Sequence, residues 1–293
     1  MAKTNKLTSW NLAYILIFVF VLMPSSAWAQ DEAEVDSTAW QKNLVALLAG
    51  SQASYDNWAE GGINSLAFTA SLNGDFQRTT TSWIQKHEMR LALGSLKQDT
   101  LDFRKADDLI QWASRFEYKN DDTFAKWHPT AAVELRTQFA TGFDYSGAEP
   151  LKVSAFFSPA TLTETVGFSY SPQEWFSWLI GLGAKQTIVG IDSLRTSYGN
   201  DVDQLTRFEA GLNSKASVDR DIFENVNLKT SLSVFSAFDD FGRPDVRWEN
   251  LVTMTVNSWL TVGFEFVTFY DLDIDDRVQL KQVLSTGISV GLL

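Results

Sequence analysis

Apolar and polar residues alternate along most of this chain, and the longest regular stretch runs from Ile63 to Gln77. Successive side chains of a β-strand point to opposite faces, so this pattern predicts a strand with one apolar face. The stretch is longer than the roughly five or six residues of a typical soluble strand, and it matches a tilted strand that crosses a bilayer. Its apolar or glycine positions are Leu66, Phe68, Ala70, Leu72, Gly74 and Phe76.

The same alternation predicts an all-β protein of about twelve strands, within a range of roughly ten to fourteen. An even number of antiparallel strands brings both chain ends to one side, as in bacterial single-chain outer-membrane barrels. We therefore expect a transmembrane, up-and-down β-barrel. The expected strands are 43–54, 63–78, 82–96, 109–118, 129–143, 155–170, 175–188, 204–218, 226–238, 246–256, 259–270 and 279–292.

The connections between these strands are expected to alternate between short and long. Short turns fall at 79–81, 119–126, 171–174, 219–225 and 257–258. Longer loops fall at 55–62, 97–108, 144–154, 189–203, 239–245 and 271–278. Short periplasmic turns and longer outer loops are typical of outer-membrane barrels, whereas a sandwich has no reason to alternate in this way.

Opposite charges stand two residues apart at five places on the polar parity of these strands. Residues i and i+2 of a strand share one face of the sheet. With the polar face outside, the fold would be a soluble sandwich; with that face inside, it would be a membrane barrel. A charge facing lipid at mid-bilayer costs ~2–4 kcal/mol, so in a barrel the pairs must line the lumen. They are Glu88/Arg90, Arg115/Glu117, Glu134/Arg136, Arg207/Glu209 and Arg247/Glu249.

Tryptophans supply a further signal for a membrane barrel. The indole ring prefers the level of the lipid headgroups, so tryptophans at strand ends are typical of an aromatic girdle. The residues at or near the expected strand ends are Trp58, Trp83, Trp127, Trp175, Trp178, Trp248 and Trp259.

The N-terminal residues resemble an export signal. Lys3 and Lys6 precede the apolar run Leu12–Met23, and Ala27-Trp28-Ala29 offers a cleavage site. This order predicts a secretory signal peptide over 1–29, with a retained membrane anchor as the alternative.

The remaining chain is expected to form a short periplasmic lead-in over 30–42 and one barrel over 43–293. The formal net charge of −12 argues against a nucleic-acid partner. Cysteine is absent, and a barrel closed by its own hydrogen bonds does not need disulfides. The expected surroundings are outer-membrane lipid and lipopolysaccharide.

The segment Asn57-Trp58-Ala59-Glu60-Gly61-Gly62, followed by Ile63-Asn64-Ser65, resembles the opening motif of a Bacteroidota family catalogued as domain of unknown function 3078. The segments 157–160 and 170–172 fit the same pattern less specifically. The resemblance implies an outer-membrane β-barrel without an assigned activity. Asn57, Trp58, Gly61 and Gly62 form the family-like loop motif; a tight, interface-anchored turn and a ligand site are both compatible with it.

Two interpretations of the lumen charges remain open and are compatible. They form a cross-strand ladder that narrows the lumen, or they select solutes. In the selective interpretation, cations line a path for an anionic solute opposite Glu88, Glu134 and Glu265. Those cations are Arg90, Arg115, Arg136, Arg207 and Lys229.

The resulting hypothesis is a passive, porin-like pore for small polar solutes. A structural or partner-binding barrel without conductance is the first alternative, and a barrel hydrolase using His87 or His128 with Ser82 or Ser114 is the second. No enzyme activity and no cofactor are expected. No metal site is expected either, because an EF-hand starting at Asp271 would need Gly at 276 and Glu at 282, where Asp and Gln stand.

Overall fold

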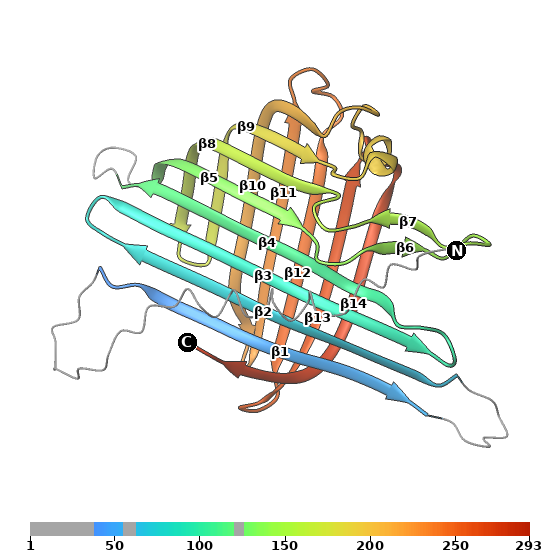
Figure 1. Ribbon diagram of the computed structural model, residues 1–293. Coiled ribbons are helices and arrows are strands. Elements are labelled where there is room, and N and C mark those ends of the chain that lie inside the picture. The colour runs from blue at the N-terminus through green and yellow to red at the C-terminus, as the bar shows by residue number, and fades with distance from the viewer. Residues whose placement is uncertain (1–37, 55–62, 120–125) are drawn as a thin grey trace, which may run out of the picture. The chain divides into compact units, whose positions relative to one another are not determined.

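Twelve antiparallel strands form a closed barrel in the computed structural model, which describes residues 38–54, 63–119 and 126–293 (Figure 1). Eleven of the twelve neighbouring pairs join barrel strands that follow one another along the chain, and the twelfth joins the first strand to the last. A separate hairpin stands in the chain between two of these consecutive barrel strands. The barrel strands are β1 (Gln41–Ala53), β2 (Ser65–Thr79), β3 (Trp83–Gln98), β4 (Arg104–Tyr118), β5 (Trp127–Thr137), β8 (Ala160–Gln173), β9 (Phe176–Ile188), β10 (Thr206–Phe223), β11 (Val226–Ala237), β12 (Asp245–Thr255), β13 (Leu260–Asp271) and β14 (Asp275–Gly291).

The barrel closes by pairing its first and last strands. Val45 lies opposite Gly291 and Ala49 opposite Gly287, so β1 and β14 leave no free edge between them. The prediction of an all-β, twelve-stranded, up-and-down barrel is confirmed. Strand β1 begins at Gln41, two residues before the expected boundary at 43, because Gln41 and Lys42 still pair with β2. The expected signal peptide lies outside the described residues.

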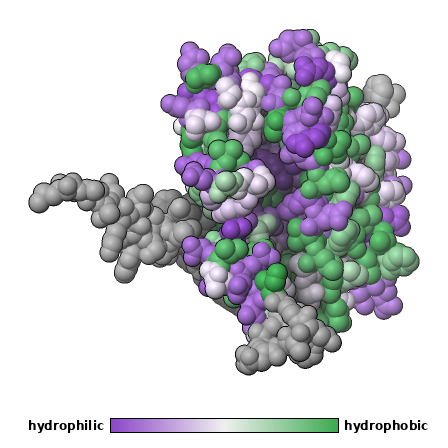
Figure 2. Space-filling model, turned by 90° about the vertical axis from the view of Figure 1, so that its right-hand side faces the viewer, coloured by the Kyte–Doolittle hydropathy of each residue, from purple (hydrophilic) through white to green (hydrophobic). Residues whose placement is uncertain are grey.

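Burial separates a polar interior from an apolar exterior. Large apolar side chains are exposed on the outer wall, including Val166 at 69% and Leu284 at 73%. Lys185, by contrast, is 6% exposed and Thr165 is 3% exposed. A soluble sandwich would bury its apolar parity, so this distribution supports the barrel over the sandwich. Figure 2 shows hydrophobic residues on the flank and hydrophilic residues around a central recess.

The predictions of two long loops are wrong. The stretch 97–108 is largely strand, because β3 extends to Gln98 and β4 starts at Arg104, with a shift of the β3–β4 register at Gly94/Ser95. The stretch 271–278 is a tight hairpin in which Asp271 lies opposite Asp275. Charged residues suggested loops, but strands that project towards water can carry them.

Strand β5 is also shorter than the expected 129–143. It ends at Thr137 because Asp108 accepts hydrogen bonds from the backbone of Phe139 at 2.7 Å and Ala140 at 2.8 Å, which diverts the chain. The following segment forms the hairpin β6 (Gly142–Asp144) and β7 (Leu151–Ser154).

We call the two ends of the barrel the turn rim and the loop rim. The turn rim carries the short connections 80–82, 174–175, 224–225 and 256–259. The loop rim carries the β6–β7 hairpin and the segment 189–205, which contains the 3-10 helix η1 (Asp192–Tyr198). No helix in residues 38–54, 63–119 and 126–293 is long and apolar enough to cross a membrane.

Among the residues that the structure describes, most tryptophans lie at or near the turn rim. Trp83 stacks edge-on with Tyr118 at 5.2 Å, and Trp127 lies 4.9 Å from the Tyr170 ring. Trp259 is 51% exposed in the last turn. These rings form an aromatic band around the outer wall, the arrangement expected of a headgroup-level girdle. Trp248 lies inside β12, away from this band.

Candidate functional site

The lumen contains two polar cavities, one above the other along the barrel. The loop-rim cavity has a volume of about 580 Å³ and reaches Tyr198 and Asp271. The turn-rim cavity has a volume of about 330 Å³ and reaches Glu174 and Asp219. They abut, because they share the lining residues Lys86, Glu88, Arg115, Ser177, Lys215 and Ser217.

A chain of alternating charges crosses the lumen, and one of its members lines the loop-rim cavity while three line the turn-rim cavity. Its members point inwards from six strands, and each cation contacts an anion on a strand that is not its barrel neighbour. We call this chain the ion-pair belt. In order of contact it consists of Arg136, Glu249, Arg90, Glu265, Lys281 and Asp107.

Distances within the belt are those of charge-assisted hydrogen bonds, with one longer link. Arg136 Nη1 donates to Glu249 Oε1 at 2.7 Å, and Arg90 Nη1 lies 3.7 Å from Glu249 Oε2. Arg90 Nη2 donates to Glu265 Oε1 at 3.2 Å. Lys281 Nζ then lies 2.9 Å from Glu265 Oε2 and 2.8 Å from Asp107 Oδ1. The belt thus starts on β5, passes through strands of the opposite wall and ends on β4, the neighbour of β5.

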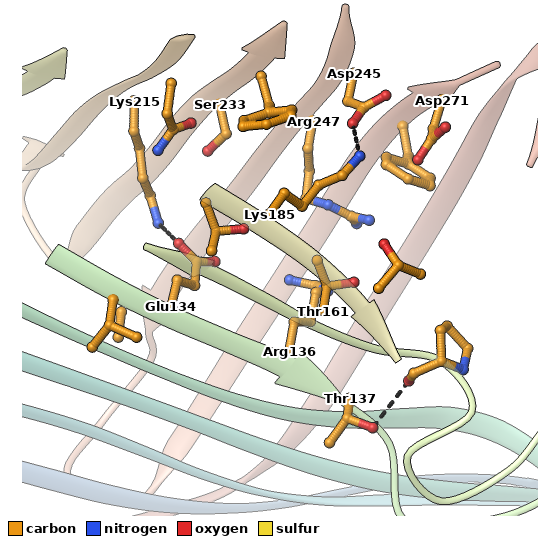
Figure 3. A pocket seen from close by; sticks show the side chains of 18 of the residues that line it. Glu134, Arg136, Thr137, Thr161, Lys185, Lys215, Ser233, Asp245, Arg247 and Asp271 are labelled. Atoms are coloured by element: carbon orange, nitrogen blue, oxygen red, sulfur yellow. Dashed lines mark hydrogen bonds and ion pairs between the residues drawn. The ribbon is translucent and has the colours of Figure 1, made fainter. Parts of the chain in front are cut away.

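Two further ion pairs join separated strands. Lys215 Nζ on β10 donates to Glu134 Oε2 on β5 at 2.6 Å (Figure 3). Lys229 Nζ on β11 donates to Asp75 Oδ1 on β2 at 2.9 Å. A charge that leaves bulk water is stable only when it is paired and hydrogen-bonded, so these contacts explain how a narrow lumen holds so many ionised groups.

The five charge pairs expected from the sequence have different partners in the structure. Only two pairs bond internally: Arg115 Nε lies 2.9 Å from Glu117 Oε1, and Arg207 Nη2 lies 3.2 Å from Glu209 Oε2. The carboxylates Glu117 and Glu209 line neither cavity, and the Glu117 side chain is only 1% exposed. The members of the other three pairs line the cavities, and four of them, Arg90, Glu134, Arg136 and Glu249, bind other partners.

The proposed path of cations for an anionic solute is largely neutralised. Each of its five cations lies within 4 Å of a carboxylate. Two lumen charges behave differently: Glu88 and Arg247 line the cavities but make no ion pair or hydrogen bond within the described ranges. The sequence placed both on the lumen parity, but it could not reveal which charges stay free, because the partners come from distant strands.

The mouth of the loop-rim cavity is tied together by loop contacts. Tyr198 Oη donates to the Val153 carbonyl at 2.6 Å, which links η1 to β7, and both residues line the cavity. Burial raises the pKa of the Tyr198 phenol. Lys185 donates to Asp245 and Arg207 donates to Asp273 at the same rim. These links join the segments that surround the entrance.

One hydrogen bond on the outer wall concerns the hydrolase alternative. His87 Nδ1 lies 2.9 Å from Ser114 Oγ, and Trp112 Nε1 donates to the same oxygen at 2.8 Å. A serine–histidine pair needs a carboxylate or amide that orients the imidazole, and the described residues supply none at His87. The imidazole instead packs between aromatic rings, including Trp40 at 5.5 Å and Phe116 at 5.5 Å.

The family-like loop motif of Asn57, Trp58, Gly61 and Gly62 lies outside the described residues. Among the residues that the structure does describe, no group of histidine, aspartate and glutamate side chains has the arrangement of a metal site.

Comparison with known proteins gives a partial family assignment. Residues 51–143 match the family described as "Protein of unknown function (DUF3078)". This match supports the family named from the sequence, over about a third of the chain. No curated protein matches significantly.

Several solved structures match most of this chain at low identity. The translocator domain of the autotransporter NalP from Neisseria meningitidis is 9% identical, with a TM-score of 0.35; the match covers 85% of this chain and 86% of that one. An outer membrane channel from Pseudomonas putida F1 is 9% identical, with a TM-score of 0.37 and coverages of 88% and 98%. The NanC porin is 10% identical, with a TM-score of 0.35 and coverages of 84% and 97%. These likenesses concern architecture alone.

The matched segment contains only half of the belt. Arg90, Asp107 and Arg136 lie within 51–143, whereas Glu249, Glu265 and Lys281 lie beyond it. The belt therefore depends on residues from both the matched and the unmatched parts of the chain.

Proposed function

We propose that this protein is an outer-membrane barrel that passes small polar solutes through a lumen constricted by the ion-pair belt. The observation that carries the proposal is the pair of adjoining cavities, lined by charged and polar residues, in the lumen that the belt crosses, inside a barrel with an apolar outer wall. An eight-stranded barrel is filled by side chains, and sixteen strands leave an aqueous channel. Twelve strands with side chains joined across the lumen suit a narrow, size-limited path.

The ion-pair belt determines which solutes such a path can pass. Its alternating charges present a donor or an acceptor at each step, so a hydrated polar solute can exchange water for side-chain hydrogen bonds. A large or apolar solute would have to separate several ion pairs without replacing their contacts. We therefore propose permeation by small, polar molecules.

The proposed location follows from the outer wall. Its exposed apolar residues and the aromatic band at the turn rim fit lipid acyl chains and headgroups. We propose the outer membrane as the location, with lipid and lipopolysaccharide as the surroundings and no nucleic-acid partner. No enzymatic role is proposed.

Efflux from liposomes tests this function. Refolded protein would be reconstituted in liposomes loaded with radiolabelled glycerol, glucose or maltotriose, with protein-free liposomes and liposomes carrying heat-denatured protein as controls. We expect efflux of the smaller solutes above both controls and retention of the trisaccharide. Retention of all three would contradict a diffusion pore.

A barrel without conductance, serving as a structural or binding protein, is the second candidate. It is favoured by one observation: the belt extends from β5 to β4 through strands on the opposite wall. Such a barrel would retain every solute in the efflux experiment while remaining folded in the same liposomes.

A further inference from the structure

Arg247 is the one arginine or lysine lining the loop-rim cavity that has no acidic partner within the described ranges. The six other cations there are each held by a glutamate or aspartate. Arg247 is followed two residues later by Glu249, but that carboxylate is bound by Arg136 and Arg90 instead. A guanidinium that faces a cavity without an ion-pair partner can accept an external anion, because a charge away from bulk water is stable only when it is paired.

The surroundings of Arg247 hold its guanidinium group in place. The guanidinium carbon lies 3.9 Å from the centre of the Phe269 ring, its direct cross-strand neighbour on β13. Stacking on an aromatic ring uses the face of the guanidinium and leaves its N–H edges free for a planar, bidentate acceptor. Ser233, the cross-strand neighbour on β11, adds a hydroxyl beside the arginine.

A second guanidinium reaches the same cavity from another wall. Arg136 on β5 lies opposite Thr161 of β8 in the strand register, as Arg247 lies opposite Ser233. Figure 3 shows Arg136, Thr161, Lys185 and Arg247 gathered around the cavity. The cavity therefore contains two guanidinium groups, each with a neighbouring hydroxyl, and only Arg136 has a carboxylate partner.

We propose that Arg247, together with Arg136, binds the carboxylate of a small hydroxylated organic acid on the loop-rim side of the belt. The planar fork of arginine matches a carboxylate, and the serine and threonine hydroxyls match a polyhydroxylated body. Glu134, Asp245 and Asp271 line the same cavity and disfavour doubly charged phosphate. The site refines the proposed pore by naming its solute class, so it rests on that function.

Binding of a solute carboxylate at Arg247 would also change the contacts within the ion-pair belt. Because Glu249 is shared by Arg136 and Arg90, a solute carboxylate at Arg247 can take over Arg136 while Glu249 keeps Arg90. This exchange replaces one charge-assisted hydrogen bond by another and leaves no buried charge unpaired. The first step past the constriction would therefore be a change of partners.

Calorimetric titration of the refolded protein in detergent with gluconate measures the site independently of transport. We expect saturable gluconate binding, weakened at least about tenfold in Arg247→Gln because a charge-assisted hydrogen bond is lost. Arg277→Gln removes the same charge from an arginine that is 82% exposed at the loop rim, and it is the matched control, with unchanged binding expected. Phe269→Leu, which keeps the charge and removes only the stacking surface, should weaken binding by a smaller factor.

Reversal potentials in planar bilayers under a potassium gluconate gradient provide the second readout. Gluconate binding that depends on Arg247, without any channel current, supports the site and contradicts the pore. Channel currents whose gluconate selectivity is the same in wild type and Arg247→Gln, with no heat of binding, overturn the site and leave the pore. Inorganic phosphate that binds as tightly as gluconate would overturn the assignment to carboxylates.

Discussion

Arg136 on β5 donates a 2.7 Å hydrogen bond to Glu249 on β12, although four other strands separate the two around the barrel. This contact ties one wall of the lumen to the other and forms one end of the belt. It also leaves Arg247, two residues before Glu249, without that carboxylate as a partner. One ion pair thus joins two walls of the lumen and leaves a free guanidinium beside it.

Glu249→Gln is expected to lower the free energy of unfolding by about 1–3 kcal/mol, because Arg136 and Arg90 lose a charged acceptor inside the lumen. Equilibrium urea unfolding in detergent micelles measures the effect. The control is Glu149→Gln, the same substitution at an exposed position between β6 and β7. Equal midpoints for the two variants would mean that the belt contributes nothing to stability.

Gly167→Ala should impair folding of the β8–β9 pair. A β-carbon at Gly167 would lie 2.1 Å from the Ile180 carbonyl oxygen, a backbone atom that cannot move away alone. Overpacking of this kind costs about 1–3 kcal/mol or more. Gly291→Ala meets nothing within 4 Å and is the matched control. The folded fraction on unheated electrophoresis gels should fall for the first variant only, and equal fractions would refute the close packing.

The aromatic band predicts where tryptophan fluorescence is quenched. Lipids brominated near the headgroup should quench more strongly than lipids brominated near the chain end, because Trp83, Trp127 and Trp259 lie at the turn rim. Replacing the two strand-interior residues, Trp112 and Trp248, by phenylalanine should strengthen that preference. Quenching independent of bromine depth would contradict a headgroup-level girdle.

Alkaline pH is expected to loosen the mouth of the loop-rim cavity. Burial raises the pKa of Tyr198, so the link from Tyr198 to Val153 is fully present below the usual tyrosine pKa of about 10. It is lost as pH rises through the higher folded-state value, since a phenolate cannot donate. Tyr198→Phe should therefore show, already at neutral pH, a severalfold faster cleavage by trypsin at the exposed Lys152.

The rates of trypsin cleavage at neutral and at alkaline pH are compared within each protein. Cleavage of wild type should accelerate at alkaline pH once the change in trypsin activity is corrected with a peptide substrate, and cleavage of Tyr198→Phe should not accelerate further. Parallel pH profiles for the two proteins would show that this hydrogen bond does not hold the mouth.

Local patterning predicted the strands well, because the alternation that defines a strand is carried by neighbouring residues. The alternation around Leu66 and Phe68 predicts which face of the strand they occupy without information from any other strand. The partners of the lumen charges were not predictable in this way. Arg136 and Glu249 meet because the stagger of twelve strands brings them to one level, and that stagger depends on every register in the barrel.

Errors at the loop rim have a related cause. The charged stretch around Lys105 and Asp108 resembles a loop by composition, but Lys105 Nζ contacts Asp108, Gln138 and Ser154 across the rim. Those contacts stabilise strand β4 beyond its expected start, and no local pattern encodes them. The alternation predicted Arg247 on the lumen face, whereas its lack of a partner became visible only in three dimensions.

Single-channel recording in planar bilayers tests the central claim most directly. The double variant Arg136→Gln/Glu249→Gln removes both charges of the 2.7 Å contact, so the lumen charge is unchanged while one end of the belt is cut. We predict stepwise currents for the wild type and a larger unitary conductance for the double variant, with Arg277→Gln equal to the wild type. Folded wild-type and double-variant barrels that both carry no current would contradict a solute path through this lumen.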